Sequence, residues 1–306
     1  MPAKLPIIAT PSRSETTARC YRRHSIADVA YMQRTGTVEP PLAFGTVIHA
    51  GSAEWWLTRD YNRVMQALHN SYHDPENYPH LVDNPKHTFA LAVSMLEVYM
   101  EKATLMGDHF CKDEKEWSII EIEERCELEL PHGLLSFQMD RLLRFHSPSP
   151  TPYKLIDTKT AARLDTRWRD RWSRSLQMKL YAYGVKEKYG SVPLVEIEGV
   201  LKTVGSDVEY VLLPVWSDGE LEEAVMLVDW FLQQDTRWLE KATLEDGSVD
   251  MVKLLELLLT KTPFNSDDCF AYYKPCPLLD CCSSLPEQRV SLLLSDFEEF
   301  VPKFLE

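Results

Sequence analysis

The sequence predicts an α/β fold, with a central mixed β-sheet flanked by helices. Three observations lead to this fold class. Apolar residues recur at helical spacing near both ends of the chain, the spacing changes to a period of two between residues 117 and 160, and helical patterns then alternate with short apolar runs. Alternating elements of this kind are typical of a sheet covered by helices.

Three helices are expected before the sheet. They span residues 14–33, 44–70 and 86–106, and Ser14 is placed to cap the first of them. In the third helix the apolar residues fall at i, i+3 and i+4 positions, which indicates one buried face.

The strands follow in the middle of the chain. Residues 117–130 and 133–145 alternate between apolar and polar side chains, and Asp140 lies on the face opposite to Phe137 and Met139. The proline-punctuated stretch 146–152 predicts a turn, after which residues 153–160 form a third strand. Two more strands are expected at residues 195–204 and 209–216.

Helices are again expected at residues 165–190 and 219–242. Trp168, Trp172, Leu176 and Leu180 form one apolar stripe along the first of these two helices. The chain shows no internal repeat and no low-complexity tract, so we expect residues 1–306 to form a single domain.

The composition is that of a globular protein, with 44% hydrophobic and 26% charged residues among 306. No apolar run approaches the roughly 20 residues of a membrane span, and the N-terminal stretch has no apolar run followed by a cleavage site. We therefore expect a soluble protein of the cytoplasm with no membrane partner. The net charge of −14 is unevenly spread, because residues 141–190 hold seven Arg and five Lys against three Asp and one Glu.

Asp157 and Lys159 lie two positions apart on the strand at 153–160 and therefore share one of its faces. A surface ion pair is one explanation of this arrangement. The other is a hydrolytic site in which the carboxylate holds a divalent cation and the lysine serves the attacking water. Asp140, on the neighbouring strand, can converge with Asp157, and two such carboxylates bind Mg²⁺ or Mn²⁺.

The order of four short motifs resembles the RecB-type branch of the PD-(D/E)XK nuclease superfamily. The motifs are G-x-x-x-H at Gly45 and His49, an Asp on a strand, D-x-K, and Q-x-x-x-Y at Gln177 and Tyr181. The resemblance implies a restriction-endonuclease-like core. It also implies roles for six residues: metal binding by His49, Asp140 and Asp157, hydrolysis aided by Lys159, and site shaping and DNA contact by Gln177 and Tyr181. A buried histidine at position 49 and ordinary packing at positions 177 and 181 are the alternatives.

Five of the seven cysteines lie at the two ends of the chain, at Cys20, Cys269, Cys276, Cys281 and Cys282. In a cytoplasmic protein, clustered cysteines more often bind metal than form disulfides. One cysteine before the core and three after it resemble the iron–sulfur nucleases of the same superfamily, including the AddB-type domain and the CRISPR-adaptation exonucleases. The resemblance implies a [4Fe–4S] cluster on Cys20, Cys269, Cys276 and Cys282, joining the N-terminal helix (about 14–34) to the C-terminal tail (about 265–285). Zn²⁺ is the second possibility, and the choice between Cys281 and Cys282 stays open.

The resemblance also suggests where DNA would lie. Relatives carry basic residues just after the first cysteine, which corresponds to Arg22 and Arg23. The helix that follows the D-x-K strand opens with further basic and aromatic residues that suit phosphate contact and base stacking, namely Arg167, Trp168, Arg171 and Arg174.

Together these features predict a metal-dependent DNA exonuclease that acts on single-stranded DNA or DNA ends. An internally cutting endonuclease of the same superfamily and a non-catalytic DNA-binding module are the alternatives. The chain has no P-loop motif, so any helicase or recombinase partner is a separate protein. The cysteine spacing in the tail resembles phage-type members, which suggests a role in phage or bacterial DNA replication, recombination or repair.

Overall fold

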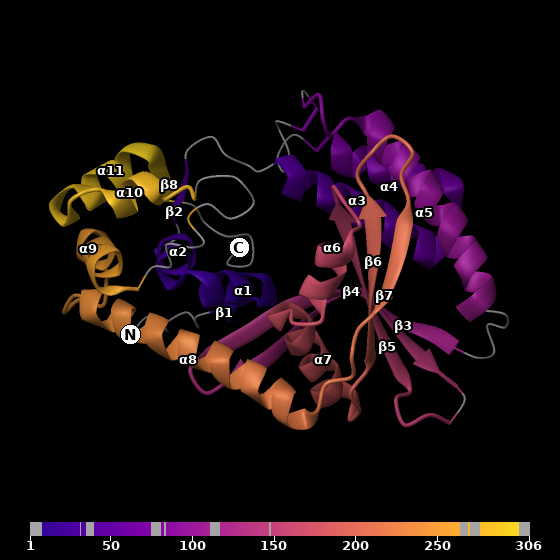
Figure 1. The fold of residues 1–306 in the computed structure, drawn as a ribbon. Helices are drawn as coiled ribbons and strands as arrows, with labels where there is room; N and C mark the ends of the chain where they lie inside the picture. The colour runs from indigo at the N-terminus through magenta and orange to yellow at the C-terminus, as the bar shows by residue number, and fades with distance from the viewer. Residues whose placement is uncertain are drawn as a thin grey trace. The chain divides into compact units, whose positions relative to one another are not determined.

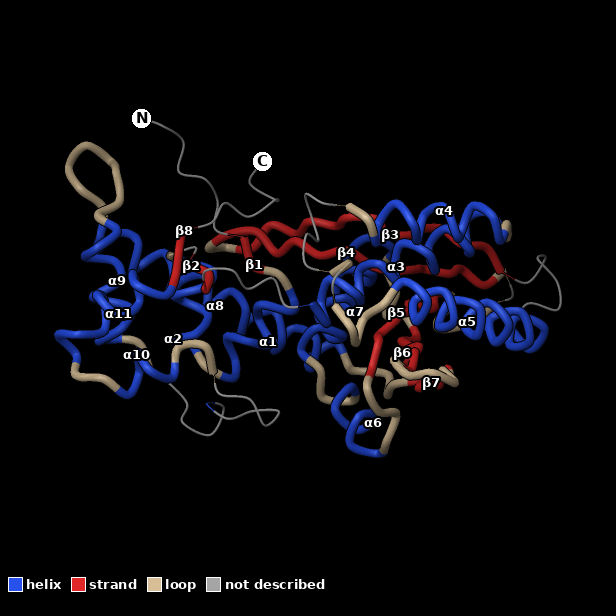
Figure 2. Tube along the Cα trace, turned by 90° about the horizontal axis from the view of Figure 1, so that it is seen from above, coloured by secondary structure: helices blue, strands red, loops and turns tan. Residues whose placement is uncertain are grey.

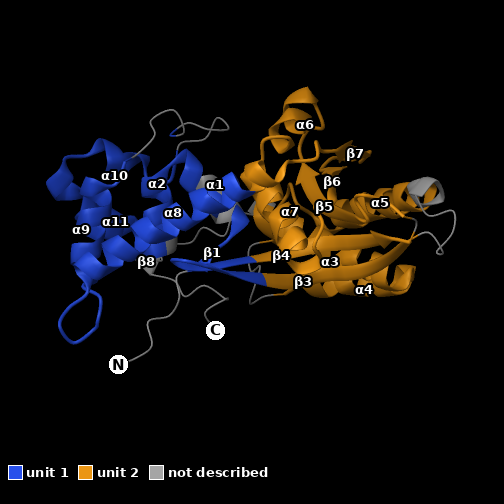
Figure 3. Ribbon diagram, turned by 90° about the horizontal axis from the view of Figure 1, so that it is seen from below, with its two compact units in different colours: residues 1–37, 127–136, 222–306 blue, residues 38–126, 137–221 orange. Residues whose placement is uncertain are grey.

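The computed structural model describes residues 8–30, 32–34, 40–74, 81–82, 84–110, 117–146, 148–263, 269 and 276–299. The chain divides into two compact units (Figure 3). Unit 1 contains residues 1–37, 127–136 and 222–306, and unit 2 contains residues 38–126 and 137–221.

A mixed β-sheet forms the centre of the fold, as predicted. Its strands are β3 (Trp117–Leu130), β4 (Gly133–Phe145), β5 (Tyr153–Ala161), β6 (Leu194–Leu201) and β7 (Val208–Leu212), with the two-residue strand β1 (Ile8–Ala9) paired in parallel to residues 134 and 135. Figure 2 shows β3 and β4 as the long paired strands. β5 runs antiparallel to β4 and parallel to β6, and β6 runs antiparallel to β7.

The register between β4 and β5 brings the two acids of the sheet together. Arg141 pairs with Ile156, so the next residues on the two strands are Asp140 and Asp157. Directly opposed residues of an antiparallel pair point to the same face of the sheet. The carboxylates of Asp140 and Asp157 therefore share one face, and Arg141 points to the other.

Three helices of unit 2 pack together on β6 and β7: α3 (Pro40–Thr58), α4 (Tyr61–Tyr72) and α5 (Phe89–Phe110) (Figure 1). Phe44, Leu68 and Leu96 are fully buried in their core. We predicted one helix over 44–70, but the chain breaks at Arg59, whose φ is 55°. Asp60 then caps α4 by accepting hydrogen bonds from the backbone of the next turn, which ends one helix and starts another.

The helix predicted over 165–190 is also two helices, α6 (Thr166–Trp172) and α7 (Leu176–Tyr189). The break lies at Ser175, because its hydroxyl accepts a hydrogen bond from the backbone N–H of Met178 and so caps α7. α7 packs closely on β4, since a Cβ at Gly184 would lie 2.0 Å from the ring of Phe137. Gly184 is therefore required at this position.

Unit 1 is mainly helical. It contains α1 (Pro11–Arg19), α2 (Tyr21–His24), the π-helix η1 (Ser25–Val29), most of α8 (Asp218–Ala242), α9 (Met251–Lys261), α10 (Leu279–Ser283), the short 3-10 helix η3 (Pro286–Gln288) and α11 (Arg289–Asp296). Strand β2 (Met32–Arg34) pairs with β8 (Phe297–Glu299). The apolar core of unit 1 contains Ile26, Leu254 and Leu258.

The helix predicted over 14–33 is interrupted at Cys20, whose backbone is extended. This break separates α1 from α2 and turns the chain at the first cysteine. Most of the predicted tail segment 265–285 before Cys276 lies outside the described residues, except for Cys269. Within the described ranges, none of the helices combines the length and apolarity that a membrane crossing requires.

Candidate active site

Three side chains of unit 2 form a set suited to a metal ion. Nδ1 of His49, on α3, lies 3.2 Å from Oδ2 of Asp140 on β4 and 3.7 Å from Oε1 of Glu123 on β3. One ligand atom from each of the three lies within 4.8 Å of the other two. Imidazole nitrogen and carboxylate oxygen are ligands for Mn²⁺ and related divalent cations, so these residues fit such an ion.

Glu123 was not among the predicted site residues. Its φ of 50° lies in the left-handed region, which is unusual for a residue other than glycine. Gln138 holds Glu123 in this conformation, because its Nε2 donates hydrogen bonds to the carbonyl oxygen and to Oε2 of Glu123. Because glutamates recur along β3, no local pattern distinguishes Glu123 from the others.

Asp157 and Lys159 form a close pair on β5. Nζ of Lys159 lies 2.9 Å from Oδ1 and 2.8 Å from Oδ2 of Asp157, but it makes a hydrogen bond of good geometry only to Oδ1. Oδ2 is buried without a hydrogen-bond partner, and Asp157 is only 1% exposed. This oxygen has Lys159 as an ion-pair partner but accepts no hydrogen bond, so it can also serve as a ligand for a divalent cation.

The charges of the site influence one another. Burial raises the pKa of Asp157 to about 6, with a further upward contribution from Asp140 and an opposing one from Lys159. Burial favours neutral His49, but the carboxylates of Asp140 and Glu123 outweigh it and raise the pKa of His49 to about 10. Burial alone would raise the pKa of Asp140, but His49 and Lys159 lower it below the usual range. Without a metal, a protonated His49 thus neutralises part of the acidic cluster.

The predicted Gln177 and Tyr181 lie together on α7. Nε2 of Gln177 donates a hydrogen bond of 2.9 Å to the hydroxyl oxygen of Tyr181, and both side chains are buried. The ring of Tyr181 stacks on Phe137 at 5.3 Å between centroids. Burial raises the pKa of Tyr181, so its hydroxyl stays neutral beside Lys159. Tyr181 therefore packs through its ring and makes a hydrogen bond through its hydroxyl.

A buried polar cluster supports the strands that carry the acids. Nη2 of Arg141 lies 2.6 Å from Oε1 of Glu198, and the hydroxyls of Tyr99 and Thr158 donate to Oε2 of the same carboxylate. The backbone N–H of Thr158 donates a hydrogen bond of 2.6 Å to Oδ2 of Asp140. Thr158 therefore connects the buried cluster with a ligand atom of the site.

The predicted DNA-contacting residues differ in exposure. Arg167, Arg171 and Arg174 are exposed, and the guanidinium of Arg171 lies over the ring of Trp172, which itself lies 5.8 Å from Nζ of Lys159. We expected Trp168 to stack on bases, but it is 8% exposed because its ring fills the space above Gly199. Trp168 is a packing residue in this structure.

Arg22 and Arg23 also differ in their exposure to solvent. Arg23 is exposed, as a DNA contact requires. Arg22 is 4% exposed, and its guanidinium donates to the carbonyl oxygen of Thr262 and lies 3.9 Å from Sγ of Cys282. The one-residue step along α2 turns the first arginine inward, so Arg22 does not present its charge to DNA here.

Four of the clustered cysteines are partly exposed, and one is buried. Burial raises the pKa of the Cys282 thiol, the neighbouring thiols of Cys276 and Cys20 add to this effect, and Arg22 opposes it. The backbone N–H of Cys276 donates a hydrogen bond of 2.7 Å to the carbonyl oxygen of Cys269. Cys281 is 3% exposed and belongs to the apolar core of unit 1.

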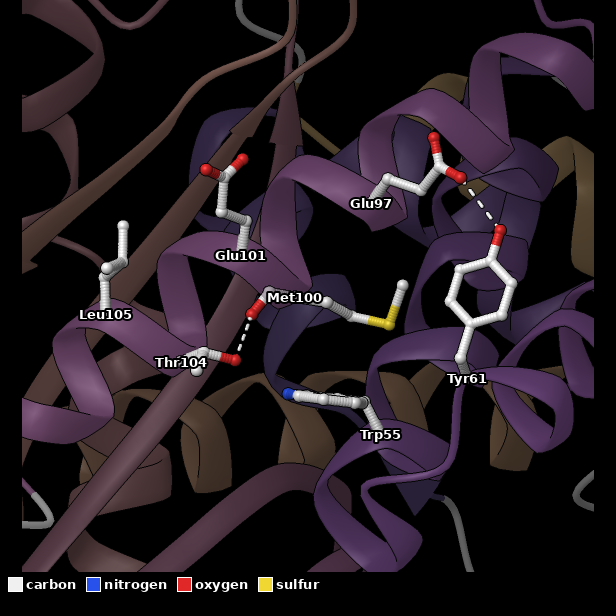
Figure 4. Close-up of a pocket in the computed structure, with 7 residues that line it drawn as sticks. All are labelled: Trp55, Tyr61, Glu97, Met100, Glu101, Thr104 and Leu105. Carbon is white, nitrogen blue, oxygen red and sulfur yellow. Dashed lines mark hydrogen bonds between the residues drawn. The ribbon is translucent and has the colours of Figure 1, made fainter.

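A separate hollow of about 360 Å³ lies among α3, α4 and α5 (Figure 4). Trp55, Met100 and Leu105 line it, and Glu97 and Glu101 stand at its sides. Its lining includes neither a lysine nor a histidine, which distinguishes the hollow from the site that contains His49 and Lys159.

The site combines carboxylates, a histidine and a lysine on a mixed sheet, which are the parts of a metal-dependent hydrolase. The family model of the PD-(D/E)XK nuclease superfamily matches residues 9–283, and the chain belongs to this superfamily. No curated protein sequence matches it.

The solved structures that are similar to the chain include two of low sequence identity. One is a candidate exonuclease from Eubacterium rectale, with 12% identity and a TM-score of 0.47, in a match that covers 91% of this chain and 94% of that one. The other is the protein SSO0001, with 9% identity and a TM-score of 0.28, in a match that covers 61% of this chain and 72% of that one.

Proposed function

We propose that the protein is a metal-dependent DNA exonuclease that hydrolyses phosphodiester bonds in single-stranded DNA or at DNA ends. Membership of the superfamily supports a nuclease. The observation that carries the proposal is the Asp157–Lys159 pair beside the His49–Glu123–Asp140 cluster. An ordinary strand-surface ion pair would not lie next to a histidine and two further acids.

Mg²⁺ or Mn²⁺ would be held by Asp140 and Asp157, together with His49 and Glu123. Bound there, the cation supplies a Lewis acid for the phosphoryl oxygen and lowers the pKa of an attacking water. The four side chains provide the negative charge and the imidazole nitrogen that such an ion requires. Thr158 keeps Asp140 in place through its backbone N–H.

Lys159 would orient the water and stabilise charge on the phosphate. Its ammonium forms an ion pair with Asp157. Burial alone would lower the pKa of Lys159, but the neighbouring carboxylates raise it, so the side chain stays protonated. A protonated lysine acts as a fixed positive charge and hydrogen-bond donor. The neutral hydroxyl of Tyr181, positioned by Gln177, adds a second donor near the same charges.

DNA would approach over α6. Arg167, Arg171 and Arg174 are exposed there, and residues 141–190 carry a local excess of positive charge in a chain of net charge −14. Phosphate groups are attracted to such a surface, and Arg171 and Trp172 lead from it towards Lys159. Arg23 is available as a further basic contact in unit 1.

We also propose that Cys20, Cys269, Cys276 and Cys282 bind a [4Fe–4S] cluster. The influence of Cys20 and Cys276 on the Cys282 thiol supports a common site, as does the backbone bond between Cys276 and Cys269. The burial of Cys281 in the apolar core favours Cys282 as the ligand of that pair. When bound, the cluster would join the N-terminal segment to the C-terminal tail.

Zn²⁺ is the alternative occupant of this site, because four thiolates also suit a tetrahedral zinc ion. Iron analysis of the purified protein distinguishes the two.

We place the activity in phage or bacterial DNA replication, recombination or repair, in the cytoplasm of a bacterial cell. A helicase or recombinase would act as a separate protein, because the sequence has no P-loop. Residues 1–306 would act as one nuclease domain whose two units are joined by the shared chain.

The test is digestion of end-labelled linear and closed circular single-stranded DNA by protein purified without oxygen, with Mg²⁺ or Mn²⁺. We expect loss of the linear substrate only, abolished by Lys159→Ala and retained in Lys154→Met. Lys154, on the same strand as Lys159, makes a buried ion pair with Glu196 on β6, so the second variant controls for loss of a buried pair. Cutting of the circle would identify an endonuclease, and binding without cleavage of either substrate would identify a binding module.

A further inference from the structure

The inward arginine of α2 lies beside the proposed cysteine site. Nη1 of Arg22 is 3.9 Å from Sγ of Cys282, and Nη2 donates a hydrogen bond of 2.7 Å to the carbonyl oxygen of Thr262. The backbone N–H of Arg22 donates to the carbonyl oxygen of Pro263 at 3.1 Å. The end of α9 thus holds both the backbone and the guanidinium of Arg22, and the guanidinium faces the thiol as a result.

The neighbours of Arg22 keep this orientation in place. His24 lies 2.8 Å from Oδ2 of Asp235 through Nε2, and the hydroxyl of Tyr21 donates a hydrogen bond of 2.7 Å to Oδ1 of the same carboxylate. All three side chains are buried. Because Tyr21 and His24 anchor the two ends of α2 to α8, the helix cannot rotate to turn Arg22 outward without breaking both contacts.

We propose that Arg22 is the positive counter-charge and hydrogen-bond donor of the cysteine site. This inference rests on the proposed [4Fe–4S] cluster. Four thiolates make the site net negative, and reduction adds one more negative charge. A buried guanidinium at a ligand sulfur stabilises the reduced form more than the oxidised form, so it raises the reduction potential. Arg22 is thus a positioning and tuning residue rather than a DNA contact.

Arg23 provides a matched control. It has the same charge, it is the adjacent residue of the same short helix, and its side chain is exposed. A general effect of removing one positive charge from α2 would therefore be the same for both residues. An effect that acts through the sulfur is expected for Arg22 alone.

The experiment measures iron content and midpoint reduction potential of the full chain, purified or reconstituted without oxygen, by a dithionite titration followed in electron paramagnetic resonance. The variants are Arg22→Gln, Arg22→Lys and Arg23→Gln. We expect the potential to fall in Arg22→Gln and to fall less in Arg22→Lys, which keeps the charge but lacks the fork that reaches both Thr262 and Cys282. Arg23→Gln should match the parent protein.

The outcomes separate the two proposals. If the parent protein binds no iron, the iron–sulfur assignment is wrong, and the role of Arg22 falls with it. An iron-loaded parent whose potential is unchanged in both Arg22 variants overturns the role of Arg22 alone. If Arg22→Gln does not fold, Arg22→Lys decides, since a potential equal to that of Arg23→Gln contradicts the proposal.

Discussion

Nζ of Lys159 lies within 2.9 Å of both carboxylate oxygens of Asp157, although the two residues differ greatly in exposure. The side chain of Asp157 is 1% exposed, whereas that of Lys159 is 22% exposed. The pair therefore has one member that can hold a cation out of water and one that can meet a substrate.

Removal of Lys159 should separate catalysis from stability. Lys159→Met leaves Asp157 buried without its partner, which costs about 3 kcal/mol in the metal-free protein. The rate of DNA cleavage should fall roughly 10²- to 10⁴-fold. Lys154→Met should lose a similar stability, because Glu196 is then unpaired, but keep the rate. Chemical denaturation and a cleavage assay measure the two effects, and equal losses of rate would contradict a catalytic role for Lys159.

Glu123 should contribute to metal affinity although the sequence did not single it out. In Glu123→Gln one anionic ligand is lost, so Mn²⁺ affinity measured by calorimetry should fall roughly 10- to 100-fold. Glu124→Gln is the control, because Glu124 is exposed and pairs with Lys188 at 3.1 Å. Similar affinities in the two variants would show that Glu123 does not bind the ion.

Metal binding should release protons near neutral pH. The pKa of His49 is raised to about 10 by Asp140 and Glu123 despite its burial, and an imidazole must be neutral to bind a cation. Mn²⁺ affinity should therefore increase with pH, and titration calorimetry at pH 7.5 in buffers of different ionisation enthalpy should report about one released proton. His49→Gln should abolish most of this release. If His49→Gln releases as many protons as the parent protein, the protons come from another group.

The raised pKa of His49 also affects the stability of the metal-free protein. The pKa of His49 is higher in the folded than in the unfolded state, so its contribution to stability is full below about 6.5 and is lost as the pH rises through about 10. Thermal unfolding between pH 6.5 and 10 should show a falling midpoint with EDTA present. His49→Gln should flatten this dependence, and an unchanged slope would argue against the assignment.

The adjacent cysteines should differ in their effects on iron. Cys282→Ser removes a proposed ligand, so iron content and the brown absorbance should be lost. Cys281→Ser places a hydroxyl in the apolar core, which should lower stability by about 1–3 kcal/mol and leave the iron in place. Iron analysis beside thermal unfolding distinguishes the two. The reverse pattern would make Cys281 the ligand.

Strand positions were the part of the fold that local pattern predicted best. The bounds of β3 and β4 match the alternating runs, since period-two patterning and a tight turn are local properties. The breaks at Asp60 and Ser175 were missed, because each capping residue sits within a continuing amphipathic pattern. α9 was missed as well, although its leucines form a buried face.

The residues of the candidate site also fall into those that local patterns predicted and those that they did not. The motifs singled out His49, Asp140, Asp157 and Lys159, and the fold brings these residues close together. The inward turn of Arg22 depends on its contact with Thr262, which is distant in sequence, and the left-handed backbone at Glu123 is held by Gln138 on another strand. No local pattern contains such contacts, so neither role could be predicted from spacing.

The buried cluster of Arg141, Glu198 and Thr158 also constrains how this site can vary. Asp140 and Arg141 are neighbours that point to opposite faces of the sheet, so a slip of one residue between β4 and β5 would move a guanidinium to the place of the Asp140 carboxylate. The buried ion pair with Glu198 would break in the same step. An engineered insertion or deletion of a single residue in β4 should therefore disrupt the buried support and the candidate site together, whereas changes in the turns at either end of the strand leave this register intact.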